Sequence, residues 1–233
     1  MKTMHALVIA AGLAVAALVF GMFFYSARVT NDTIGVVGAA TKRFESDIVK
    51  WRITLSRNTG LNNVSEGYTK IQDDLQFLRT QLVEKGFPEQ ELSIQPINTR
   101  SNWEEGKVSG YTVNQSIYLI TANIAAVEEL ALKPAALVER GLVLENSDLE
   151  YFYSKLAEIK MELLAKATTD ARRRAEEIAN NAGVSLGNIT NARTGVFQIT
   201  EPFSTEVSDY GMYNTRTKQK DITVTVRASF KVR

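Results

Sequence analysis

Cysteine is absent from the chain, and histidine occurs once, as His5. Without cysteine there can be no disulfide, no thiolate nucleophile, no cysteine-ligated metal and no lipidated N-terminal cysteine. His5 stands before a long apolar run, so it is poorly placed to serve a site in the rest of the chain. Zinc sites and nucleophile–base pairs thus lose their commonest components. We therefore expect no metal, no cofactor and no enzymatic activity.

Neither positive nor negative charge is in clear excess in the chain. The chain carries 27 basic and 26 acidic residues, and its first 27 residues contain one lysine and no acid. Residues 28–233 thus hold 26 residues of each sign. Phosphate binding needs a concentrated basic face, so this balance argues against nucleic acid as a partner. The proportions of hydrophobic and charged residues, 45% and 23%, are those of an ordinary folded domain.

Acid pairs and glycine motifs offer little chemistry. Asp73–Asp74, Glu104–Glu105 and Glu128–Glu129 are adjacent pairs that diverge on a helix or lie in a loop, so they are poor candidates for catalysis by paired carboxylates. Gly35 and Gly38 do not begin a phosphate loop, because no Gly-Lys-Ser/Thr follows them. Glycines in a strand more often mark a bulge or a close approach of another backbone.

A long apolar run near the start of the chain decides the expected location. Residues 6–25 are 20 nearly all apolar residues, about 30 Å long as a helix, which is enough to cross a bilayer. A cleaved signal peptide is the alternative, although bulky Tyr25 spoils the cleavage pattern. We expect residues 1–29 to be an uncleaved anchor in the bacterial inner membrane and residues 30–233 to be a periplasmic body. The flanking charges hardly fix this orientation.

Hydrophobic periodicity divides the body into strands and helices. In residues 46–58, for example, alternate positions are apolar, as in a half-buried strand. Pro134 must kink or restart the second helix, and a bulge is expected near Ala228. Strands are predicted at 33–44, 46–58, 91–100, 110–122, 142–154, 188–200 and 221–232, and helices at 64–85, 124–140 and 155–182. Polar loops are predicted at 201–218 and at 101–110, and the loop at 101–110 is expected to join its two strands as a hairpin.

The order strand, helix, strand occurs twice, in residues 46–100 and in residues 110–200. An α+β fold is therefore expected, with two strand-helix-strand halves whose antiparallel sheets are packed by helices.

The passage AKATTDARRRAEEIANNAGVSLG, at residues 165–187, is the most distinctive in the chain. Together with GYTVNQSIYLI from residue 110, IGVVGAATKRF from residue 34 and DITVTVRASFKV from residue 221, it resembles the SIMPL family of bacterial envelope proteins. The resemblance implies an α+β domain, an envelope location and self-assembly into rings, and it implies no catalytic residues. The family's Pro-Asp pair is replaced by Phe44-Glu45-Ser46-Asp47, which affects only a local turn.

A stripe of small residues in that passage suits close packing. Its members, spaced by four, are Ala167, Ala171, Ala175 and Ala179. The stripe either packs on the protein's own sheet or forms a helix contact between protomers. Arg172, Arg173 and Arg174 point to three sides of the helix, so they cannot form one basic patch. Arg172 can pair with Glu176, and Arg173 with Glu177, at i,i+4 spacing.

Aromatic residues and a methionine in the two polar loops suit a protein interface. The candidates for a partner contact are Trp103, Phe203, Tyr210, Met212 and Tyr213. Packing of these side chains on their own domain is the alternative.

Two functions fit these observations. The first is a non-enzymatic, membrane-anchored envelope protein with a structural or stress-related role, whose SIMPL-like body forms a homo-oligomer, in the family's case a ring. The second is a periplasmic module that binds a ligand or a protein partner in a cleft between the two halves.

Overall fold

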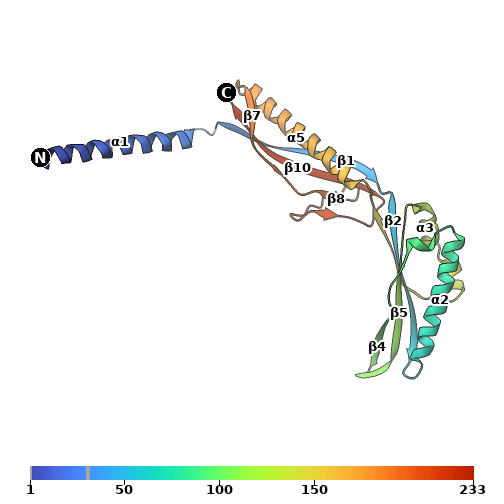
Figure 1. Ribbon diagram of the computed structural model, residues 1–233. Helices are drawn as coiled ribbons and strands as arrows, with labels where there is room; N and C mark the ends of the chain where they lie inside the picture. Colours follow the sequence, from blue (N-terminus) through green and yellow to red (C-terminus); the bar gives the residue numbers. More distant parts are fainter. Residues whose placement is uncertain (1, 30–31) are drawn as a thin grey trace. The chain divides into compact units, whose positions relative to one another are not determined.

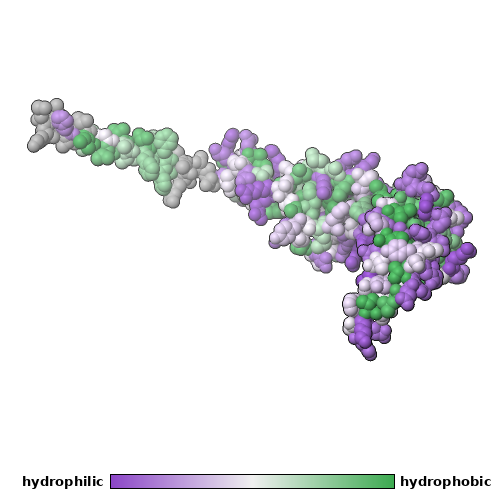
Figure 2. Space-filling model, turned by 60° about the horizontal axis from the view of Figure 1, so that its bottom comes forward, coloured by the Kyte–Doolittle hydropathy of each residue, from purple (hydrophilic) through white to green (hydrophobic). Residues whose placement is uncertain are grey.

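The computed structural model describes residues 2–29 and 32–233, without the side chains of residues 2–4, 6, 8, 26–29 and 136. The first element, α1 (Lys2–Val29), has a mostly apolar surface, which is green in Figure 2. Its exposed apolar side chains include Leu13 and Phe20. Within these described residues, no helix has the length and apolar character needed to cross a membrane. The span predicted at residues 6–25 is not supported by this finding and stays a prediction. The predicted junction of anchor and body falls on residues 30 and 31, outside the described part.

The chain forms two compact units. One comprises Met1–Thr41, Lys160–Phe197 and Thr223–Arg233, and the other comprises Lys42–Ile159 and Gln198–Ile222. These units are not the two consecutive halves predicted from the sequence. The physical reason is long-range pairing: β2 (Ile48–Gly60) pairs along its whole length with β5 (Lys107–Thr121), so strands from both predicted halves share one sheet. The broader prediction of an α+β fold with antiparallel sheets and helices is confirmed.

The unit that contains residues 42–159 is built on an antiparallel sheet (Figure 1). Its order is β3-β5-β2-β6, and β4 also pairs with β5. The remaining strands are β3 (Leu92–Ile94), β4 (Asn98–Glu104) and β6 (Leu144–Phe152), and the helices are α2 (Val64–Glu84), η1 (Glu89–Glu91), α3 (Ile124–Leu132) and α4 (Ala135–Glu139). Helices α2 and α3 contact β2 and so cover one face of this sheet.

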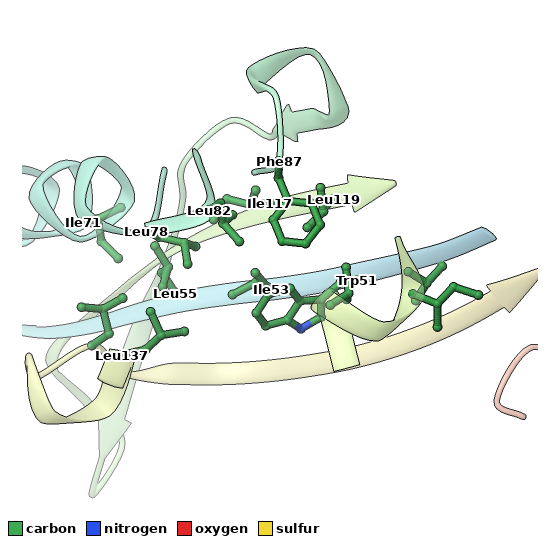
Figure 3. Close-up of a cluster of buried hydrophobic side chains, with 14 of the residues drawn as sticks. Trp51, Ile53, Leu55, Ile71, Leu78, Leu82, Phe87, Ile117, Leu119 and Leu137 are labelled. Atoms are coloured by element: carbon green, nitrogen blue, oxygen red, sulfur yellow. The ribbon is translucent and has the colours of Figure 1, made fainter. Parts of the chain in front are cut away.

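The core of this unit follows from the predicted alternation. Trp51, Ile53 and Leu55 of β2 are fully buried, and Figure 3 shows them pointing toward the helix side chains. The apolar seam of α2 meets them through Ile71 and Leu78, as its helical spacing predicts. The indole nitrogen of Trp51 donates to Ser147 Oγ at 2.9 Å, so the largest core side chain keeps a polar partner.

The second sheet has the order β1-β10-β8-β9, and β7 also pairs with β10. Its elements are β1 (Thr33–Glu45), β7 (Leu186–Thr194), β8 (Gln198–Thr200), β9 (Met212–Tyr213) and β10 (Gln219–Val232), and α5 (Leu156–Asn181) lies on one face of β1 and β10 (Figure 1). Burial alternates along β10, so that even-numbered residues such as Val226 and Phe230 face α5. The odd-numbered residues form the opposite face.

Several predicted boundaries need correction. The hairpin predicted at residues 101–110 is present, but its loop is shorter than predicted, because β4 and β5 continue to Glu105 and Gly106, both at positive φ. Pro134 does break the predicted helix, which becomes α3 and α4. The strand predicted at 188–200 is interrupted at residues 195–197. The irregularity expected near Ala228 falls between Ser229 and Val232 in the pairing with β7.

Candidate functional site

The five residues predicted for a partner contact lie on two different parts of the fold. Trp103 is near the end of β4 and is 68% exposed. The other four belong to the segment between β8 and β10, where Tyr210 is 97% exposed and Met212 is half-buried. Tyr213 packs edge-on against Phe152, with ring centroids 6.2 Å apart. Trp103 and Tyr210 therefore present free aromatic surface, whereas Tyr213 is partly held by its own domain.

The exposed ring of Phe203 packs on an arginine that is itself held in place by hydrogen bonds. Its ring lies over the guanidinium of Arg43, 4.4 Å from the ring centroid, and is 86% exposed. Two hydrogen bonds of 2.8 Å hold Arg43 to the carboxylate of Asp221. These bonds lower the pKa of Asp221. Phe203 also has a φ of 65°, an uncommon conformation for a residue other than glycine. The arrangement presents an aromatic ring to solvent, which suits contact with a protein better than catalysis.

The alanine stripe faces the protein's own sheet. All four alanines, Ala167, Ala171, Ala175 and Ala179, are fully buried within this chain. Gly38 of β1 lies so close to α5 that an added Cβ would come within 2.3 Å of the carbonyl oxygen of Ala167. The stripe therefore allows a strand backbone to approach the helix, which is the first of the two alternatives considered for it. It leaves no room on this helix face for another protomer.

Asp170 connects α5 to β1. Its carboxylate accepts the backbone N–H of Ala39 at 3.0 Å and hydrogen bonds from Arg173 and Arg174 at 2.9 and 2.7 Å. These donors, the backbone N–H first, lower the pKa of Asp170 to about 2. Arg173 thus pairs with Asp170 and not with Glu177, because a residue at i−3 is equally close on a helix. The predicted pair of Arg172 and Glu176 forms at 2.8 Å.

A groove runs between β1 and α5 beside this contact. It has a volume of about 760 Å³ and is lined by Gly35, Val36, Val37, Arg173, Arg174, Glu177 and Ile178. Val37 and Ile178 are 45% and 48% exposed, so the groove has apolar as well as charged surface. β1 is the terminal strand of its sheet, and its free edge adjoins this groove. An extended chain can add to such an edge by backbone hydrogen bonds.

Lys220 is the most unusual titratable residue in the fold. It is fully buried, and its ammonium donates to Ser46 Oγ at 2.8 Å and to the carbonyl oxygen of Tyr151 at 2.7 Å. Both acceptors are uncharged, so burial lowers the pKa of Lys220 to about 8. A lysine next to a serine hydroxyl can act as a base in catalysis. Here Ser46 is buried as well, so neither group is open to a substrate, and the pair serves to connect β10 with the β1–β2 junction and β6.

Sequence reasoning missed Lys220 and Asp170, although a signal existed for the lysine. Lys220 is two residues before Ile222 and four before Val224, so it is in phase with the buried face of β10. A charged residue at an apolar position of an alternating strand is a candidate buried group. Asp170 gave no such signal, because its acceptor role depends on β1, which is 131 residues away in the sequence.

A comparison with protein families identifies the family that this chain resembles. The model of the family SIMPL, described as a protein of unknown function (DUF541), matches residues 34–232. No curated protein matches this chain. The match covers both sheets and α5, and it includes the distinctive passage at residues 165–187.

Proposed function

Because this chain belongs to the SIMPL family, whose function is unknown, we propose that it is a non-enzymatic, membrane-anchored protein of the bacterial envelope whose body associates with further copies of itself. In this proposal α1 is held in the inner membrane and the body lies in the periplasm. The apolar run at residues 6–25 supports the anchor. One structural observation carries the association, namely the free edge of β1.

The edge of β1 offers a place for another strand. β1 is 13 residues long and ends its sheet. The N–H of Ala39 points to Asp170, away from the neighbouring strand. Since backbone groups in a strand alternate in direction, the N–H of Val37 points the same way. An unpaired strand edge of this kind is a template for pairing with another chain.

A second copy of the chain suits the groove beside this edge. Antiparallel pairing of β1 with itself gives a two-fold contact, in which the same surface of both copies is used. The groove carries both signs of charge on one helix, with Arg173 and Arg174 followed by Glu177. A two-fold axis reverses their order in the partner, so that arginine of one copy can face glutamate of the other. The contact is therefore self-complementary in charge as well as in hydrogen bonding.

The test is the mass of the full chain in uncharged detergent, measured by size-exclusion chromatography with light scattering. We expect an oligomer that Val37→Pro dissociates, because proline removes an outward N–H while a sheet edge tolerates it. The matched control is Val207→Pro, at a position that is 80% exposed and belongs to no helix or strand. A full chain that stays monomeric at every accessible concentration would contradict the proposal, as would an oligomer that both variants leave intact.

A further inference from the structure

The part of the second sheet that shares a unit with most of α5 has more basic than acidic residues in its strands. The strand segments at residues 33–41, 186–194 and 223–233 contain no aspartate or glutamate. They contain four cations, which are Arg193, Arg227, Lys231 and Arg233, and all four are exposed. The even charge balance of the whole chain thus conceals a local excess of positive charge.

Two of these cations are direct neighbours. Arg227 of β10 is paired in register with Arg193 of β7. Like charges directly opposite each other in a sheet are destabilising. In the part of the chain that the structure describes, neither arginine forms an ion pair. On α5, in contrast, exposed arginines are neutralised within the helix, as in the pair of Arg172 with Glu176 at 2.8 Å.

The surroundings of the pair suit an oxyanion. Arg227 and Lys231 are odd-numbered residues of β10, on the face opposite to α5. The next row of the sheet pairs Ser229 with Asn191, whose hydroxyl and amide groups are further donors. Gly35 lies beside Ser229, since a Cβ added there would be 3.9 Å from the Ser229 hydroxyl. Small donor side chains therefore lie in the row between Arg227 and Lys231, where they can donate to a phosphate group.

Chain connectivity keeps the end of β10 close to α1. The N–H of Val232 donates to the carbonyl oxygen of Asp32 at 2.9 Å, so the end of β10 is fixed next to residue 32. α1 ends at Val29. Three residues reach at most about 11 Å. Lys231 and Arg233 therefore lie within a short distance of the end of α1, whatever path the intervening residues take.

We propose that Arg193, Arg227 and Lys231 bind the phosphate groups of anionic phospholipids in the membrane that holds α1. The inference rests on the membrane anchor of the proposed function. Clusters of basic residues next to a membrane attract anionic lipid headgroups, and arginine binds phosphate through two parallel hydrogen bonds. The cost of placing Arg193 opposite Arg227 is then offset when the phosphate lies between them.

The experiment uses the full chain in nanodiscs of phosphatidylcholine, with or without phosphatidylglycerol. The measured quantity is the melting temperature of the body. A ligand that binds only the folded state raises this temperature, and we expect a rise of roughly 2–5 °C with phosphatidylglycerol at low salt. High salt should abolish the rise, as should the double variant Arg193→Gln/Arg227→Gln.

The matched control is Arg100→Gln/Arg140→Gln, which removes the same charge from the other unit and should keep the rise. An equal melting temperature in both lipids overturns the inference and leaves the proposed anchor intact. Failure of the chain to enter nanodiscs of either lipid refutes the anchor and, with it, the inference. A similar rise with soluble polyglutamate in phosphatidylcholine discs would assign the face to acidic proteins and so overturn the lipid assignment.

Discussion

At the scale of single residues, Lys220 makes stability depend on pH. Its pKa is about 8 in the folded chain, below the ordinary value of 10.5, because the buried ammonium has lost its hydration. Below pH 8 the lysine is charged in both the folded and the unfolded state. Between pH 8 and 10.5 the folded state releases the proton while the unfolded state keeps it. The free energy of unfolding must therefore rise with pH across this interval.

We expect this rise to approach about 3 kcal/mol, since each pKa unit corresponds to about 1.4 kcal/mol. Urea unfolding at pH 7.5, 8.5 and about 10 would measure it. The upper limit keeps the effect of Tyr151 small: its pKa is raised from the ordinary value of 10.0 to about 12 in the folded state, so its ionisation in the unfolded chain lowers stability increasingly at higher pH. Lys220→Met should remove the rise, whereas exposed Lys107→Met should retain it. An equal pH dependence in Lys220→Met and the natural chain would refute this assignment.

The hydrogen-bond and ion-pair partners of single side chains were predictable only where the two residues are close in the sequence. Arg172 and Glu176 are four residues apart on one helix, so helical geometry was enough to pair them. Asp170 accepts from Ala39, and Lys220 from β10 donates to Ser46, across 131 and 174 residues of sequence. These contacts depend on which strands become neighbours, and periodicity carries no such information. For this reason the sequence alone did not lead to the Lys220 pair or to the contact at Asp170.

At the scale of elements, the packing of β1 on α5 depends on Gly38. An added Cβ would lie 2.3 Å from the backbone of Ala167 and of Ala171, and backbone atoms cannot move aside as a flexible side chain can. Gly38→Ala should therefore lower the free energy of unfolding by about 2–3 kcal/mol, in the range of an overpacked core. Urea denaturation of the two proteins under identical conditions would measure the difference.

Gly35 is the matched control in the same strand. A Cβ at Gly35 would meet only the Ser229 hydroxyl at 3.9 Å, an ordinary contact distance. Gly35→Ala should change stability by less than about 0.5 kcal/mol. If Gly38→Ala were as stable as Gly35→Ala, the close approach of β1 to α5 would not exist in solution.

Elements were more predictable than their pairing. The alternation in β2 and the helical seam in α2 located both elements, because one face of each is buried in the same core. Pro134 marked a true break, because the effect of a proline on a helix is local to its own position. The hairpin at 101–110 was predicted correctly, but its loop was predicted too long, because polar side chains also suit a strand at the edge of a sheet, as β4 is. The two-halves prediction failed at a longer range, where β2 pairs with β5.

At the scale of the whole molecule, the proposed anchor and the proposed strand-edge contact should reinforce each other. Chains held in one bilayer meet at a higher local concentration than free bodies do, and tethering of this kind can strengthen association by about 10²–10⁴ without any new contact. We therefore expect residues 32–233 to dissociate on dilution at concentrations at which the full chain in vesicles stays associated. Energy transfer between labelled copies, measured across a dilution series, would compare the two.

The control for this prediction replaces residues 1–29 by an unrelated membrane-spanning helix. Association should return with it, because the anchor acts through concentration and not through its own contacts. Val37→Pro in the same chimaera should weaken association again, since it acts on the strand edge. If the chimaera behaved like the free body, α1 itself would supply the contact between copies. In that case the free edge of β1, with the groove beside α5, would no longer account for assembly.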